Sequence, residues 1–208
     1  VEDDMLASPH FLEYMNEALD FYKDNKLVWS ISGYTFPMKK LENYPHDVYM
    51  SGRGCCWGWG SWNDRWDMVD WEVSDYSKFK HNWIKRIKFG RWGRDLPIML
   101  DNQMYSNHQS WAIRWCYSEF VNNMVTVYPT ISYIQNIGND GSGVHESVSL
   151  EKYDTHLENK ESYSCLFENI GVNNALRREF AAKYYMSPWK NFKQEVRWLF
   201  IRLGLLKV

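Results

Sequence analysis

The sequence predicts an α/β fold in which short strands are interspersed with amphipathic helices. Two apolar runs, residues 26–34 (KLVWSISGY) and 47–52 (DVYMSG), have the length and composition of buried strands. Residues 11–22 instead carry apolar side chains at helical spacing, and the pattern after residue 170 is helical to the end. We therefore expect strands and helices to share one layered architecture.

An acidic triplet, Glu2-Asp3-Asp4, precedes the first expected helix. Ser8 and Pro9 suit the N-cap and the first helical position. The helical stripe that follows consists of Phe11, Leu12, Met15, Ala18, Leu19 and Tyr22. We expect the triplet in the turn before this helix, at the end of a strand lying upstream. Because its carboxylates repel one another, the triplet is either a solvated turn at a helix N-terminus or is neutralised by a cation.

A glycine- and tryptophan-rich loop follows the expected strand over residues 47–52. Residues 52–62 (GRGCCWGWGSW) cannot form a regular helix, because glycine is costly there. This loop either lets the backbone approach a ligand or forms a tight aromatic turn. Further along, we expect helices over 61–71, 96–107 and 110–124, the first capped by Ser61 and the last by Ser110, strands over 125–129 and 131–138, and a polar loop over 138–147.

The composition limits the kinds of molecule that the protein is expected to bind. Aromatic residues make up 17% of the chain and either fill the core or bind sugars or bases. The formal net charge is −2, but residues 77–94 carry seven Lys and Arg and no acid. We interpret that stretch as a basic face or a site for an anionic acceptor, not as a nucleic-acid surface, because the remainder of the chain is acidic. The four cysteines form no C-x-x-C pair or disulfide framework, and no apolar run approaches twenty residues, so we expect a cytoplasmic protein.

Two polar features could bind a metal or a ligand. A hard cation such as Mn²⁺ or Mg²⁺ prefers oxygen ligands and often takes one or two carboxylates together with substrate phosphates, which the acidic triplet could supply. The glycine-rich loop over 138–147 either closes over a ligand or is a plain surface loop. His145 on this loop is either a metal ligand or simply solvated.

Five segments together resemble a known enzyme family. VEDDMLASPHFLEYMNEAL, WSISGY, GRGCCWGWGSWNDRWD, SWAIRW and YPTISYIQNIGNDGSGVH occur in this order. They resemble bacterial GT-A type sugar-nucleotide glycosyltransferases related to N-acetylglucosaminyltransferase I. The resemblance runs from residue 1 to about residue 147. It implies that residues 1–165 form the second half of a Rossmann-like mixed sheet flanked by helices, the metal and acceptor half of the catalytic domain. Residues 166–208 would then be a helical C-terminal extension.

The resemblance also implies residue roles. The E-D-D triplet corresponds to the metal-binding D-x-D motif, in which the last acid, Asp4, holds Mn²⁺ or Mg²⁺ on the donor diphosphate. Glu2 and Asp3 would contact the nucleotide ribose or the donor sugar, or support the turn. The donor-sugar wall corresponds to Trp57, Gly58 and Trp59, and the loop over the nucleotide sugar corresponds to residues 138–145, including Gly141, Ser142 and Gly143.

At the position of the family's general base, this sequence departs from the family pattern. Gln109 stands at about the position where the family has a catalytic Asp, and glutamine cannot accept a proton at neutral pH. Asp101 is the best upstream substitute and Asp140 is the next candidate. The alternative for Asp101 is a structural role, either at a nearby helix end or in a salt bridge with Arg94.

The expected function is therefore a metal-dependent, inverting transfer of a sugar from a nucleotide-diphosphate donor to a glycan or lipid-linked acceptor. The alternative is a non-catalytic, aromatic-rich carbohydrate-binding or scaffold module. The C-terminal segment could also place the protein at the inner face of a membrane, unless it packs on the core of the protein. Its apolar stripe is Phe192, Val196, Leu199, Leu203 and Leu206, with Lys193, Arg197 and Lys207 beside it.

Overall fold

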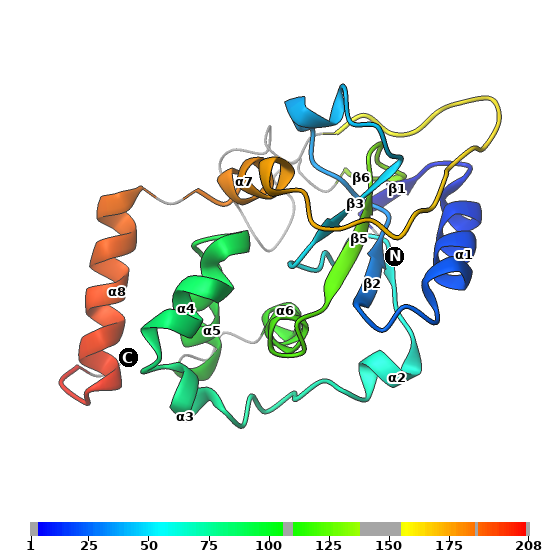
Figure 1. Cartoon of the computed structure of the whole chain (residues 1–208). Coiled ribbons are helices and arrows are strands. Elements are labelled where there is room, and N and C mark those ends of the chain that lie inside the picture. The colour runs from blue at the N-terminus through cyan, green and yellow to red at the C-terminus, as the bar shows by residue number, and fades with distance from the viewer. Residues whose placement is uncertain (1–3, 106–109, 138–154, 186, 207–208) are drawn as a thin grey trace.

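The computed structural model describes residues 4–105, 110–137, 155–185 and 187–206. Its centre is a four-stranded mixed sheet in the order β3–β5–β2–β4, and β1 pairs with β6 in a separate two-stranded sheet (Figure 1). Strands β2 and β5 run parallel, whereas β3–β5, β2–β4 and β1–β6 are antiparallel. The strands are β1 (Met5–Ala7), β2 (Val28–Ser32), β3 (Val48–Ser51), β4 (Trp59–Gly60), β5 (Val125–Pro129) and β6 (Ile134–Asn136). The α/β class is confirmed.

Helices lie on both sides of the strands. In Figure 1 the strands separate α1 from a group formed by α4, α5 and α8. The helices are α1 (Phe11–Tyr22), α2 (Asn63–Trp66), α3 (Tyr76–Phe79), α4 (Trp83–Phe89), α5 (Leu96–Tyr105), α6 (Trp111–Val121), α7 (Asn174–Ala182) and α8 (Pro188–Arg202). Two short 3₁₀ helices lie in connecting segments, η1 (Lys39–Leu41) between β2 and β3 and η2 (Gly90–Trp92) between α4 and α5. None of the helices in the described ranges combines the length and apolar character needed to cross a bilayer.

The main hydrophobic core joins both ends of the chain. All five residues of β2 are buried, as expected for a strand covered on both faces. Phe180 of α7 packs edge-on against Phe36 and Tyr128, and it belongs to the same cluster as the α1 residues Tyr14 and Tyr22. The segment expected as an extension, residues 166–208, therefore contributes to the same core as the sheet.

The beginning of the chain differs from the sequence prediction. Asp4 precedes strand β1, so a strand separates this residue from the first helix. Helix α1 begins at Phe11 with His10 at its N-cap position. Ser8 is not the helix cap, because its hydroxyl accepts the His10 N–H at 3.1 Å and donates to Glu158 at 2.8 Å. The side chain that was expected to begin the helix thus connects it to a segment far along the chain.

The helix expected over 61–71 is also shorter than predicted. Only α2 is helical, with Trp62 at its N-cap position, and the Ser61 hydroxyl donates to the Trp29 carbonyl of β2 at 2.7 Å. Further along, where the helix was expected to continue, Asp70 organises a turn in which its carboxylate accepts the backbone N–H of Ser74 at 2.6 Å. Ser110 does occupy the N-cap position of α6, but its side chain makes no capping hydrogen bond.

A buried carboxyl group links α6 to the central sheet. Glu119 has no exposed surface and accepts hydrogen bonds from the Gly54 N–H at 2.9 Å and from the Thr126 hydroxyl at 2.8 Å. The Thr126 hydroxyl also lies 2.8 Å from the Ser30 hydroxyl of β2. Burial raises the pKa of Glu119 to about 8, because the charged form loses its hydration. Near neutral pH this position therefore favours a protonated, neutral side chain.

We predict that Glu119→Gln flattens the pH dependence of stability. The folded pKa lies above the ordinary value of 4.5, so the folded state holds a proton that the unfolded state releases. The free energy of unfolding of the wild type should consequently fall as pH rises from about 4.5 to about 8, by up to about 1.4 kcal/mol per pH unit. Urea unfolding across this range measures the effect. The exposed-residue variant Glu72→Gln should keep the wild-type slope, and an equal slope in Glu119→Gln would contradict the prediction.

Candidate functional site

The expected metal ligand, Asp4, lies beside the β1–β6 ribbon. Met5 pairs with Asn136, and the Asn136 amide donates to Asp4 Oδ2 at 3.2 Å. The backbone N–H of Ile137 donates to the Asp4 carbonyl at 2.9 Å. The other carboxylate oxygen, Asp4 Oδ1, is buried and has no hydrogen-bond partner in the part of the chain that the structure describes. The carboxylate is thus oriented through one oxygen, while the other has no hydrogen-bond partner among the described residues.

The glycine- and tryptophan-rich loop packs against the same ribbon. Gly58 has a φ of +51°, and a Cβ at this position would collide with Ile134 of β6. The Gly58 carbonyl accepts the Gly33 N–H at 2.7 Å, and the Gly33 carbonyl accepts the Tyr133 N–H at 2.8 Å. Glycine is needed here because it tolerates positive φ and lets the loop touch the strand. The structure therefore brings the Gly58 loop and Asp4 to opposite ends of one short strand.

The two tryptophans that flank Gly58 enter different clusters. Trp57 packs edge-on against Tyr34 with ring centroids 4.8 Å apart, in the main core. Trp59 lies near Trp115 at 4.8 Å and stacks with Trp111 at 5.5 Å, on the side of α6. A single donor wall made of both tryptophans is therefore not the arrangement in this structure.

Trp59 instead borders a shallow tryptophan-lined pocket of about 250 Å³. Trp66 and Trp62 form its other aromatic walls, and Trp66 is 46% exposed. Flat aromatic rings with accessible faces are suited to stacking against sugar rings. We call this group, Trp59, Trp62, Trp66 and Trp111, the tryptophan platform.

Several expected site residues lie outside the described residues. These are Glu2, Asp3, Asp140, Gly141, Ser142, Gly143 and His145, together with Gln109. Within the described ranges, no group of three or more His, Cys, Asp or Glu side chains is arranged to hold a metal ion. A metal at Asp4 would accordingly need further ligands from a bound diphosphate or from water, as Mn²⁺ and Mg²⁺ commonly have.

Asp101, the expected general base, is fully buried on α5. Its carboxylate accepts two hydrogen bonds from Arg86 at 2.9 and 2.8 Å and one from the Tyr76 hydroxyl at 2.8 Å. Arg202 of α8 approaches the same carboxylate at 3.4 Å, and Glu195 completes the group through Arg86 at 3.0 Å. Asp101 therefore has a structural ion-pairing role, but the expected partner was wrong, because Arg86 and Arg202 pair with it and Arg94 does not. A carboxylate held in this way has no open oxygen for an acceptor hydroxyl, so the geometry does not fit the general-base role.

A larger cavity than the tryptophan-lined pocket lies elsewhere, between α4, η2, α7 and α8, with a volume of about 810 Å³. Part of its wall comes from the basic stretch 77–94, through residues such as Arg91 and Arg94. The opposite wall includes Arg177 and Arg178 of α7, which the sequence reasoning did not single out. The adjacent arginine pair in an otherwise amphipathic helix was the available signal. We call this cavity the basic cleft.

We predict that Asp101→Asn lowers the free energy of unfolding, because the role of Asp101 is structural and not catalytic. Removing the carboxylate leaves Arg86 and Arg202 as buried cations with reduced compensation, and breaking such a group typically costs about 3 kcal/mol or more. Urea unfolding measures the loss. Asp20→Asn, which removes a solvent-exposed partner of Lys23, should leave the free energy of unfolding nearly unchanged. Wild-type stability in Asp101→Asn would contradict the structural role.

Comparison with protein-family models, with curated proteins and with solved structures finds no match to this chain. The function is therefore inferred from the residues of this chain and their geometry. They comprise an oriented acid at Asp4, a loop at Gly58 packed against the neighbouring strand, the tryptophan platform and the basic cleft.

Proposed function

We propose that this chain belongs to a metal-dependent glycosyltransferase that moves a sugar from a nucleotide-diphosphate donor to an acceptor hydroxyl with inversion. The observation that carries the proposal is the Asp4 carboxylate, in which Asn136 orients one oxygen while the buried second oxygen has no partner among the described residues. A buried acceptor atom without a donor costs free energy, and a bound cation would offset that cost.

Each part of the site has a role in this proposal. Asp4 would hold Mn²⁺ or Mg²⁺, which when bound neutralises charge on the leaving diphosphate. Asn136 restricts the orientation of the Asp4 carboxylate, and the absence of a side chain at Gly58 lets the neighbouring loop approach β6. With Asp101 committed to its ion pairs, Asp140 is the remaining candidate for the base that takes the acceptor proton. The acceptor would be a glycan or a lipid-linked acceptor.

We predict that Asp4→Asn abolishes metal binding and metal-dependent turnover. The amide has the shape of the carboxylate but lacks its negative charge, so the attraction for a divalent cation is lost. Mn²⁺ with a nucleoside diphosphate should raise the melting temperature of the wild type and not that of Asp4→Asn. Release of nucleoside diphosphate from a panel of nucleotide sugars, in the full-length protein, should require Mn²⁺ and fall by at least about a hundredfold in the variant.

Asp24→Asn is the matched control, because Asp24 is an exposed aspartate at the far end of α1. It should retain both the thermal shift and the turnover. An Asp4→Asn protein with the wild-type response to Mn²⁺ would refute the metal site. Metal binding without donor cleavage would instead indicate that the transferase assignment is wrong.

The tryptophan platform favours the second candidate function, a non-catalytic carbohydrate-binding module. Trp66 and Trp111 are 46% and 44% exposed, although large aromatic rings are usually buried. The stacked pair Trp59–Trp111 and the tilted pair Trp66–Trp71 keep several rings together at the surface. Such a platform could bind a glycan without any donor or metal, and it could equally hold the acceptor of the proposed transferase.

We predict that neutral oligosaccharides quench tryptophan fluorescence and that Trp66→Ala weakens this binding about tenfold. That factor corresponds to the loss of about 1.4 kcal/mol, the scale of one stacking contact. Trp189→Ala is the control, because Trp189 is an exposed tryptophan of α8 outside the platform. Oligosaccharide binding together with no donor cleavage in Mn²⁺ would favour the module, and equal affinity of both variants would exclude the platform as the glycan site.

A further inference from the structure

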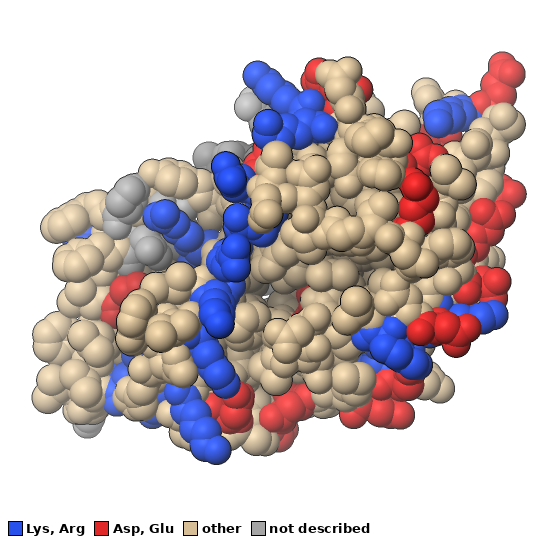
Figure 2. Space-filling view, in the orientation of Figure 1, with Lys and Arg blue, Asp and Glu red and all other residues tan. Residues whose placement is uncertain are grey.

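The basic cleft contains more positive charge than its surroundings neutralise. Seven of the side chains that line it are cationic and one, Glu195, is acidic. Glu195 and the buried Asp101 pair with two of these cations, Arg86 and Arg202. The other five have no carboxylate within salt-bridge distance in the described ranges: Lys80, Arg91, Arg94, Arg177 and Arg178. Figure 2 shows Lys and Arg as a blue stripe down the face that carries α4 and α7.

Three of these arginines crowd one another. The Arg177 guanidinium donates to the Arg91 carbonyl at 3.3 Å and to the Asn174 side chain at 3.3 Å. Partial burial, followed by the nearby charges of Arg91 and Arg178, lowers the pKa of Arg177. Neighbouring like charges raise the free energy of the unliganded protein, and an anion between them would lower it. A phosphate group, which accepts several guanidinium hydrogen bonds, is the ligand chemistry that fits.

Exposed apolar side chains border the same cleft. Trp83 and Ile87 of α4 line it and are 68% and 61% exposed, and Tyr185 and Leu199 line it from the other side. A soluble phosphate compound gains little from an apolar rim of this kind. A membrane surface, in contrast, presents phosphate groups directly beside hydrocarbon, and Trp and Tyr favour that boundary.

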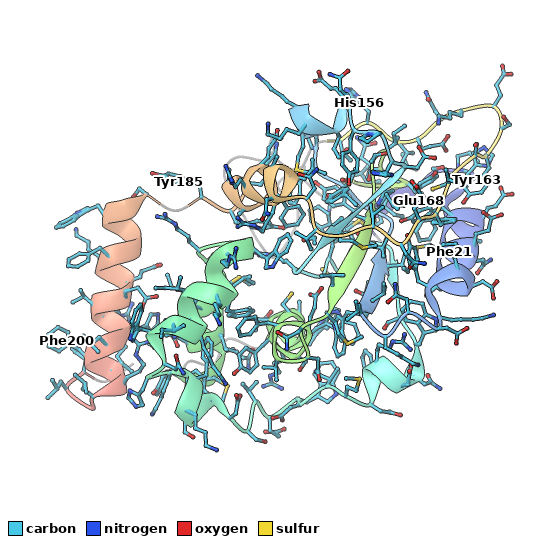
Figure 3. All side chains as sticks on the ribbon, viewed as in Figure 1. Phe21, His156, Tyr163, Glu168, Tyr185 and Phe200 are labelled. Carbon is cyan, nitrogen blue, oxygen red and sulfur yellow. The ribbon has the colours of Figure 1, made fainter. Side chains whose placement is uncertain are left out.

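Helix α8 continues this apolar surface. Its inner side packs through Trp198 and Ile201 against Ile98 of α5, and Arg202 faces the Asp101 group. Most of the apolar stripe predicted from the sequence faces outward instead, with Phe192 and Leu203 exposed by 59% and 56%, whereas Val196 is half-buried. Figure 3 shows Phe200 pointing away from the rest of the molecule on the outer side of α8. The stripe therefore does not serve to pack the helix on its own core.

We propose that the basic cleft binds the phosphate headgroup of an anionic phospholipid, with the outer face of α8 and the exposed end of α4 seated in the membrane interface. Arg91 and Arg178 supply guanidinium donors to the phosphate. Phe192, Leu199 and Leu203 enter the boundary between headgroups and acyl chains, as the apolar face of an interfacial helix does. This binding does not depend on the proposed transferase activity.

Vesicle co-sedimentation of the 208-residue chain tests the proposal. Wild type should bind vesicles of phosphatidylcholine mixed with phosphatidylglycerol, bind pure phosphatidylcholine vesicles far less, and weaken as salt increases. The double variant Arg91→Gln/Arg178→Gln should lose at least about tenfold in the partition coefficient, since each basic residue near an anionic surface contributes about a factor of five. Neither side chain makes a hydrogen bond or ion pair with another described residue, so the fold should be retained.

Lys23→Gln/Lys26→Gln is the control, because it removes the same charge from exposed side chains outside the cleft. It should bind like the wild type. A second variant, Phe192→Gln/Leu203→Gln, should lose vesicle binding while a small soluble phosphate, glycerol phosphate, still protects Arg91 and Arg178 from guanidine-specific labelling.

Four results would overturn the proposal. Equal binding of the wild type to neutral and to anionic vesicles would show that the cleft does not recognise anionic headgroups. An equal loss of vesicle binding in Arg91→Gln/Arg178→Gln and in Lys23→Gln/Lys26→Gln would show the same. Wild-type vesicle binding by Phe192→Gln/Leu203→Gln would show that α8 does not enter the interface. Displacement of the protein from vesicles by a single-stranded oligonucleotide, with tighter binding to the oligonucleotide than to lipid, would assign the cleft to nucleic acid.

Discussion

The burial of Asp101 constrains the arrangement of helices α3, α4, α5 and α8. A carboxylate with no exposed surface is stable only when nearby cations and donors replace its hydration. Arg86 from α4, Tyr76 from α3 and Arg202 from α8 converge on it from three separate helices. Moving any of these helices away from α5 would remove a hydrogen bond or an ion pair from the buried carboxylate. The walls of the basic cleft, which α4 and α8 share, follow from this arrangement.

The same cluster explains why the remaining charge in the cleft is available. Asp101 and Glu195 neutralise Arg86 and Arg202, so these two arginines serve the interior of the protein. Arg91, Arg94 and Arg178 lie outside that cluster, on the exposed side of η2 and α7. A folded chain tolerates unpaired cations of this kind where water or an anionic ligand solvates them. Charge balance thus separates the structural arginines from those that have no carboxylate partner among the described residues.

Around the β1–β6 ribbon, close packing of the backbone holds the neighbouring segments together, as the Asp101 ion pairs do for the helices. Glycines at positions 33 and 58 let the loop after β3 touch both the end of β2 and strand β6. Strand β6 then carries Asn136, which orients the Asp4 carboxylate. The acid and the loop are far apart in sequence, and this short antiparallel ribbon is the element that connects them. The proposed donor and metal region therefore depends on the β1–β6 ribbon and on the loop packed against it, whereas the basic cleft depends on helix packing.

Local patterns in the sequence determined the α/β class, strands β2, β3 and β5, and the approximate positions of α1, α5 and α6, because apolar periodicity and chain-breaking residues act over a few neighbours. The true starts of α2 and of α1 depended on hydrogen bonds from Ser61 to β2 and from Ser8 to Glu158, which no local pattern contains. The partners of Asp101 and the meeting of Arg91 with Arg177 were likewise decided by tertiary structure alone. They join residues separated by tens of positions, and such contacts are selected by the burial and charge balance of the whole fold.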